Sequence, residues 1–172
     1  MYLGTPTLGE KPIQMSDFTT SPGFKEDHPD TLVIQCSDGR YTKPVFELLR
    51  NAGCQRYDVM AMPGGPALLD MVGASITEAE ACRTGTSFLV KGHRTSTVHL
   101  IAHAGCGYYK SRFGGMGQQA LLRKQVEDMQ NAAAWLRRIN PKLLILAYFA
   151  FPKNGSVVFQ DIEIDTTRTP LY

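Results

Sequence analysis

The sequence has no long apolar run and almost no excess of either charge. No stretch approaches the roughly 20 consecutive apolar residues that a membrane-spanning helix needs, so we expect no membrane span. The formal net charge of +2 is too small to favour binding to nucleic acid or to an acidic membrane surface. The first residues, MYLGTPTLGEKP, lack the basic-then-apolar layout of a secretory signal, so we expect a cytoplasmic protein.

Cysteine is also scarce, and no two cysteines are arranged as Cys-x-x-Cys. The lack of that motif makes a redox thiol pair a weak interpretation. The four cysteines could pair as disulfides in three ways, but 172 residues, 43% of them hydrophobic, can form a core without such cross-links. The four are Cys36, Cys54, Cys82 and Cys106.

The remaining patterns alternate between strand-like and helix-like segments. Residues 1–30, rich in Pro, Gly, Ser and Thr, are interpreted as an extended N-terminal arm, and residues 31–172 as one domain. Short apolar or alternating runs predict strands over Thr31–Cys36, Tyr57–Met62, Val98–His103, Leu143–Phe149 and Val157–Ile164. Helices are predicted over Val45–Arg50, Ser75–Val90 and Gln118–Ile139, the last with its apolar face at Leu122, Val126, Met129, Ala133 and Leu136.

This order predicts an α/β protein with three layers, α-β-α. The central sheet should contain four mostly parallel strands. The Asn154-Gly155 turn should fold the last strand back as an antiparallel C-terminal edge strand. The glycine-rich stretch 108–117 is read as a loop, either a mobile connection or a flap over a site.

Three residues with metal-binding side chains are predicted to meet at one edge of this sheet. Cys36 ends the first strand, His103 ends the third, and Cys106 follows three residues later. Ligands of open parallel sheets bind outside the carboxyl ends of the strands, so neighbouring strands would bring these side chains together. Two thiolates and an imidazole suit zinc, and catalytic zinc sites use three protein ligands and leave one position open. The sequence therefore predicts a zinc site.

A charged pair, Asp38 and Arg40, follows Cys36 closely. A carboxylate beside zinc can bind the metal directly or accept a hydrogen bond from a zinc-bound hydroxide. A guanidinium two residues later can hold that carboxylate bidentately and keep it ionised. This pair favours a catalytic site over a purely structural one.

The segment Cys36-Ser37-Asp38-Gly39-Arg40 resembles the Cys-x-Asp-x-Arg motif of beta-class carbonic anhydrases, and His103-Ala104-Gly105-Cys106 resembles their His-x-x-Cys motif. The resemblance implies a zinc ion held by Cys36, His103 and Cys106, with Asp38 and Arg40 as a catalytic dyad. It also implies reversible hydration of carbon dioxide to bicarbonate by zinc-bound hydroxide, and a homodimer or a dimer of dimers.

Three places depart from the family pattern. Gly39 stands where relatives usually have Ser or Ala, Met62-Pro63-Gly64-Gly65 stands where they usually have Arg-Asn-Ala-Gly, and Asp27 stands where many have Gln. The backbone at Gly64 and Gly65 is expected to approach the substrate pocket. Two alternatives remain open: a hydrolase of carbonyl sulfide or carbon disulfide on the same scaffold, and a non-catalytic zinc-binding protein.

Overall fold

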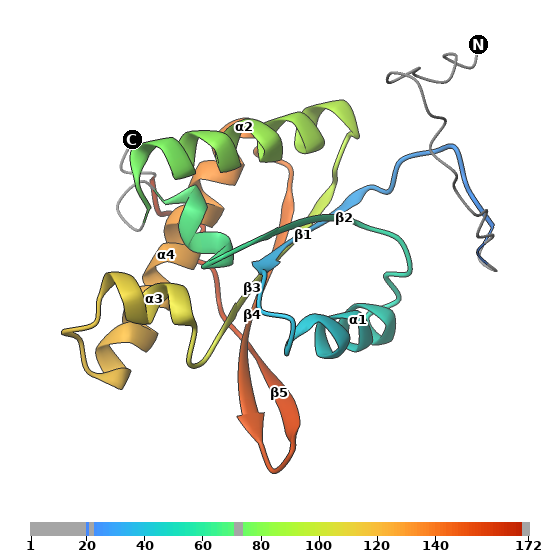
Figure 1. Ribbon diagram of the computed structural model, residues 1–172. Coiled ribbons are helices and arrows are strands. Elements are labelled where there is room, and N and C mark those ends of the chain that lie inside the picture. The colour runs from blue at the N-terminus through green and yellow to red at the C-terminus, as the bar shows by residue number, and fades with distance from the viewer. Residues whose placement is uncertain (1–19, 21–22, 71–73, 170–172) are drawn as a thin grey trace, which may run out of the picture.

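The computed structural model describes Thr20 and residues 23–70 and 74–169, which form a mostly parallel sheet flanked by helices (Figure 1). The strands are β1 (Thr31–Cys36), β2 (Asp58–Met62), β3 (Thr97–His103), β4 (Leu144–Lys153) and β5 (Ser156–Asp161), in the order β2-β1-β3-β4-β5. The first four run parallel, and β5 pairs antiparallel with β4. The predicted α/β fold, with its antiparallel C-terminal edge strand, is confirmed.

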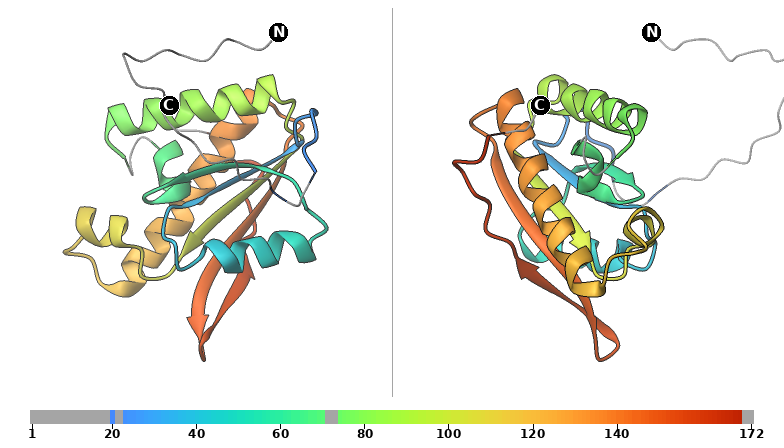
Figure 2. Two further views of the ribbon diagram at one scale, coloured as in Figure 1. Left: turned by 45° about the vertical axis from the view of Figure 1, so that its right-hand side comes forward. Right: turned by 90° about the vertical axis from the view of Figure 1, so that its left-hand side faces the viewer.

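Helices cover both faces of the sheet (Figure 2). They are α1 (Thr42–Asn51), the 3₁₀ helix η1 (Gly65–Leu69), α2 (Ile76–Gly92), α3 (Gly107–Arg112) and α4 (Gln118–Ile139). Val33 and Ile101 pack with α1 on one face, whereas Leu32 and Leu100 pack with α2, η1 and α4 on the other. Because both faces are covered, successive residues of β1 and β3 are buried, which explains their continuous apolar runs.

Several element boundaries differ from the sequence prediction. Helix α1 begins at Thr42, three residues early, because the fixed φ of Pro44 is compatible with a first helical turn. Strand β4 continues to Lys153, since its second half pairs with β5 across the Asn154-Gly155 turn. Helix α2 begins as predicted with a reciprocal capping box between Ser75 and Glu78.

The prediction of a loop over 108–117 was wrong for its first half, which forms α3. Glycine is concentrated after this helix, whereas the sequence YYKSR contains no helix breaker. The buried Tyr109 ring anchors α3 against the rest of the protein.

Most of the predicted N-terminal arm, residues 1–19 and 21–22, lies outside the described residues, so the division into an arm and a single domain stays a prediction. Among the helices that the structure describes, none is long and apolar enough to cross a bilayer.

Candidate metal centre

Cys36, His103 and Cys106 meet at the carboxyl edge of the sheet. β1 and β3 are hydrogen-bonded neighbours, as the sequence argument required. The two sulfur atoms are 3.8 Å apart, and the potential ligand atoms of all three residues lie within 4.8 Å of one another. His103 and Cys106 are buried, and Cys36 is half-buried. Tertiary structure therefore places two sulfur donors and one nitrogen donor in one small, largely buried space.

The His103 ring is fixed so that one nitrogen faces this space. Its Nδ1 lies 3.0 Å from the carbonyl oxygen of Ala104, which can only accept, so Nδ1 carries the proton. The unprotonated Nε2 is buried and has no hydrogen-bond partner among the described residues. The Tyr41 ring lies against the imidazole, with centroids 4.2 Å apart, and its hydroxyl donates to the same carbonyl at 3.2 Å. The Nδ1 hydrogen bond and the contact with the Tyr41 ring fix the imidazole so that the lone pair of Nε2 points into the site.

The two thiols ionise unequally. The adjacent Cys106 thiol lowers the pKa of Cys36 to about 4, and hydrogen bonds from the backbone amides of Gly64 and Asp38 contribute. The negative sulfur of Cys36, together with burial, raises the pKa of Cys106 above its usual range. Without a cation the pair therefore holds one proton between its sulfurs, and a bound cation would replace that proton.

The donor set fits zinc. A tetrahedral site with zinc–sulfur bonds of about 2.3 Å places two sulfurs about 3.8 Å apart, and the two sulfurs here are separated by 3.8 Å. The buried Nε2 of His103, which lacks a partner among the described residues, is the third donor that such a site needs. Two sulfurs and one nitrogen leave a fourth coordination position for a small ligand.

Asp38 and Arg40 lie beside these donors. The Arg40 Nε donates to Asp38 Oδ1 at 2.9 Å, and a terminal nitrogen of the same guanidinium donates to Oδ2 at 2.5 Å. These hydrogen bonds lower the pKa of Asp38 to about 2, so the carboxyl is ionised at neutral pH. Its Oδ2 is 3.9 Å from Nε2 of His103. An ionised carboxylate therefore borders the space between the three donors.

Gly64 and Gly65 lie directly against the metal centre. Gly65 has φ +54°, and a Cβ built there would lie 2.7 Å from the backbone nitrogen of Cys36. Gly64 has φ +86°, and its Cβ would lie 2.5 Å from the Tyr108 ring. The chain can pass this closely only with glycine at both positions. This backbone therefore packs closely on Cys36, and its place in a substrate pocket stays a prediction.

One group of residues near the site was missed by sequence reasoning. The apolar face predicted for Gln118–Ile139 is confirmed, since Met129, Ala133 and Leu136 are buried and Leu122 and Val126 pack against the same core. The helix also buries three polar residues, Gln125, Asp128 and Asn131. Gln125 Nε2 donates to the backbone oxygen of His103 at 2.9 Å. The recurrence of polar residues at positions 124, 125, 128 and 131, on one side of a helix, was the signal that could have identified them.

A cavity of about 520 Å³ lies on the α4 side of Cys106. Tyr109, Gln125 and Phe149 are among its lining residues, so it opens between α3, α4 and the end of the sheet. The other two cysteines, Cys54 and Cys82, are free thiols outside the three-residue cluster.

Comparisons with known proteins agree with this architecture. The family model described as "Putative carbonic anhydrase" matches residues 27–158. The carbonic anhydrase of Streptococcus mutans aligns with a TM-score of 0.51 at 13% identity, over 80% of this chain and 83% of that chain. At this identity the alignment supports the fold alone.

Two further solved structures align with lower scores. The Coccomyxa beta-carbonic anhydrase in complex with acetazolamide has a TM-score of 0.48 at 17% identity, over 79% of this chain and 74% of that chain. Beta-carbonic anhydrase isoform I of Trichomonas vaginalis has a TM-score of 0.48 at 12% identity, over 82% and 87%. No curated protein matches the sequence.

Proposed function

Because the chain belongs to the family described as "Putative carbonic anhydrase", we propose that it is a zinc enzyme that reversibly hydrates carbon dioxide to bicarbonate. The observation that carries the proposal is the convergence of the Cys36, His103 and Cys106 donor atoms within 4.8 Å of one another, with an ionised Asp38 at their border. A site that only stabilised the fold would have no need of a carboxylate held by its own guanidinium.

Each site residue has a distinct part in this proposal. Cys36, His103 and Cys106 hold zinc, which supplies a Lewis acid and makes water a nucleophile near neutral pH. Arg40 keeps Asp38 ionised, so Asp38 can accept hydrogen bonds but not donate them. Asp38 would therefore accept a hydrogen bond from a hydroxyl group at the open position and would orient that group for attack on carbon dioxide.

The catalytic role of Asp38 is tested by substitution. Zinc-loaded wild type, Asp38→Asn and the exposed control Asp161→Asn are compared in a stopped-flow hydration assay with a pH indicator. We expect Asp38→Asn to lose about 100-fold or more of the rate, as for other groups that orient a reacting proton, and Asp161→Asn to keep it. Zinc-loaded wild type no faster than Asp38→Asn would refute the role.

The same assay series separates the alternative functions. Carbonyl sulfide and carbon disulfide are offered in parallel, and faster turnover of either would assign the site to that substrate. A zinc-loaded protein with no turnover of any of the three would support the non-catalytic zinc-binding alternative.

The ligand set is tested by metal analysis of the purified protein. Cys36→Ser is expected to hold much less than one zinc per chain, since a neutral hydroxyl is a poor replacement for a thiolate. Cys54→Ser is the matched control, because this free cysteine lies outside the donor cluster. Full zinc retention by Cys36→Ser would refute the ligand assignment.

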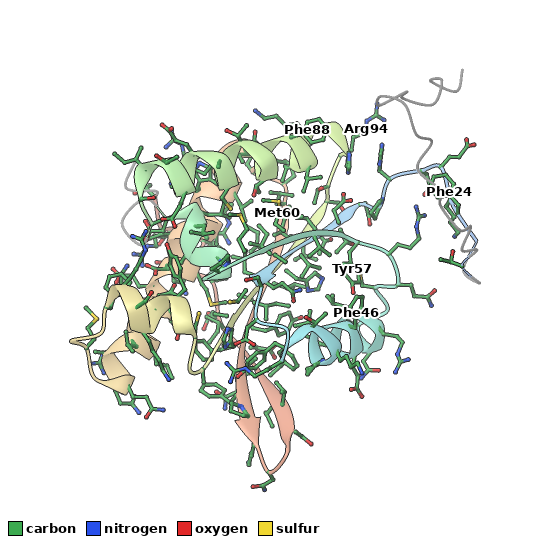
Figure 3. All side chains as sticks on the ribbon, viewed as in Figure 1. Phe24, Phe46, Tyr57, Met60, Phe88 and Arg94 are labelled. Carbon is green, nitrogen blue, oxygen red and sulfur yellow. The ribbon has the colours of Figure 1, made fainter. Side chains whose placement is uncertain are left out.

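We further propose that the enzyme is a homodimer joined along β2. Among the described strands, β2 and β5 are the two at the edges of the sheet. Large apolar side chains lie exposed beside β2, with Phe46 on the α1 side and Phe88 on the α2 side (Figure 3). An unpaired edge strand flanked by exposed apolar groups is suited to pairing with a second copy.

Charge insertion tests this interface. Val59 on β2 is 45% exposed, and Val158 on β5 is 40% exposed, so the two edge valines form a matched pair. Val59→Lys should shift the mass measured by light scattering from dimer to monomer, while Val158→Lys should leave it unchanged. A dimeric Val59→Lys protein would exclude this surface.

A further inference from the structure

Five polar side chains that have no part in the proposed reaction form a buried cluster between α4, α3 and η1. Asp128 is 0% exposed and Asp70 is 2% exposed, so two carboxyl groups are withdrawn from water. Carboxyl groups are rarely buried unless they are paired and hydrogen-bonded. The members are Asp70, Tyr109, Lys124, Asp128 and Asn131.

The cluster is held by directed hydrogen bonds. The Tyr109 hydroxyl donates to Asp128 Oδ2 at 2.7 Å, and the Lys124 ammonium donates to Asp128 Oδ1. Lys124 Nζ also lies 3.9 Å from Asp70 Oδ2, which accepts from the Asn131 amide at 2.7 Å. These bonds join three separate elements of the fold at one point.

The charges of the cluster do not cancel when both carboxyls are ionised. The groups that face Asp128 are Lys124 from its own helix, Tyr109 from α3 and Asp70 from η1. Burial raises the pKa of Asp128 and contact with Asp70 adds to the rise, whereas Lys124 and Tyr109 oppose it; the net result is a pKa of about 7. One ammonium neutralises one carboxylate, and the second carboxyl is neutral only while it keeps a proton.

The three elements joined by the cluster also support the zinc donors. Tyr109 lies three residues after Cys106, and its backbone amide donates towards the Cys106 sulfur. Asp70 directly follows η1, whose Gly65 packs on the backbone of Cys36. Helix α4 holds the His103 carbonyl through Gln125. A change at the cluster is therefore transmitted to the elements that hold the donors.

We propose that Asp128 and Tyr109 are positioning residues, and that the proton shared in this cluster keeps α3, and with it Cys106, in the geometry that retains zinc. The proposal rests on the proposed zinc site. When the proton leaves, an uncompensated carboxylate remains in the interior, which weakens the packing of α3 and η1 on α4.

The direction of the pH effect follows from proton linkage. The pKa of Asp128 is higher in the folded chain than the ordinary value of 3.8, so the folded state holds an extra proton between about pH 4 and pH 7. The contribution of Asp128 to stability is fully present below about pH 4 and is lost as pH rises through about pH 7. In the folded chain the proton leaves around pH 7, so zinc retention should lose the support of the cluster as pH rises through about 7.

Zinc release into an excess of chelator, measured from about pH 6 to pH 8.5, tests the proposal. Asp128→Asn keeps an acceptor for Tyr109 but cannot ionise. Its rate of zinc release should therefore equal that of wild type at about pH 6 and be about tenfold lower at about pH 8.5. A purely structural role would give a ratio of the two rates that is the same at every pH. A constant ratio would overturn the proposal.

Tyr109→Phe removes the hydroxyl and keeps the ring. It should release zinc up to about tenfold faster, the effect expected from losing a buried hydrogen bond. Tyr108→Phe, which loses a hydroxyl from the same helix but outside the cluster, is the control. Equal release rates for both variants would overturn the role of Tyr109.

A measurement on the wild-type chain makes the proposal independent of how the variants fold. Carboxyl carbon resonances of ¹³C-labelled aspartate, followed against pH, should include one that titrates near pH 7. If all aspartates titrate below about pH 5, the cluster holds no proton and the inference is refuted. A chain that binds no zinc refutes the proposed function, while this titration still reports on the cluster.

Discussion

Replacing Gly65 by alanine should damage the metal centre through a contact that no side chain can relieve. The added Cβ would lie 2.7 Å from both the nitrogen of Cys36 and the carbonyl carbon of Gln35. Both neighbours are backbone atoms of β1, which is fixed in the sheet by pairing with β2 and β3. Relief therefore requires either η1 or Cys36 itself to move.

Two terms set the size of the effect. Alanine at φ +54° costs about 1–2 kcal/mol, as for other left-handed non-glycine residues. Forcing a methyl group into a filled space adds about 1–3 kcal/mol. The sum, about 2–5 kcal/mol, is a large part of the 5–15 kcal/mol that typically stabilises a domain. At about 2–4 °C per kcal/mol, Tm should fall by roughly 10 °C.

Gly155→Ala separates the two terms. Gly155 has φ +77°, but a Cβ there would meet no atom within 4 Å, so this variant has only the conformational cost. Urea unfolding of zinc-loaded proteins should place Gly65→Ala about 1–3 kcal/mol below Gly155→Ala. Faster zinc release is expected only for Gly65→Ala, because Cys36 moves. Equal stability and equal zinc retention in the two variants would refute the close-packing argument.

Three further predictions concern the support of the fold and the site. Ser75→Ala removes the hydroxyl that accepts from the Glu78 amide, one half of the capping box of α2. It should lower the free energy of unfolding by about 1 kcal/mol in urea titrations, with no change in zinc content. A neutral result would show that the cap is not needed. Burial lowers the pKa of His99, so the unfolded chain takes up this proton first and stability is lost as pH falls. The unfolding free energy of wild type should therefore fall more steeply than that of His99→Gln between about pH 7 and pH 5, and parallel slopes would contradict this. Tyr41→Phe loses only the hydroxyl bond to Ala104 and should release zinc at nearly the wild-type rate. Tyr41→Leu also loses the ring that packs against His103 and should release zinc faster. Identical release rates for the two variants would show that the ring contact does not orient His103.

Local patterns were sufficient for most of the fold. The strand runs of β1 and β3, the Ser75 capping box and the Asn154-Gly155 turn each depend on interactions within a few residues, so they can be read from the chain. The helix α3 was missed because its neighbouring glycines predicted a loop, whereas burial of Tyr109 against α4 stabilises a short helix that would not form alone.

The sequence by itself determined the chemistry of the proposed site: two thiols, one imidazole and a carboxylate with its guanidinium, spaced so that parallel strands would bring them to one edge. Only the tertiary structure decided the rest. It set the 3.8 Å between the sulfurs and left Nε2 of His103 without a partner among the described residues. It also showed that Gly65 packs on Cys36, and it buried Asp128 between elements far apart in the chain. These features arise from contacts across the fold, where burial and close packing depend on which distant segments become neighbours.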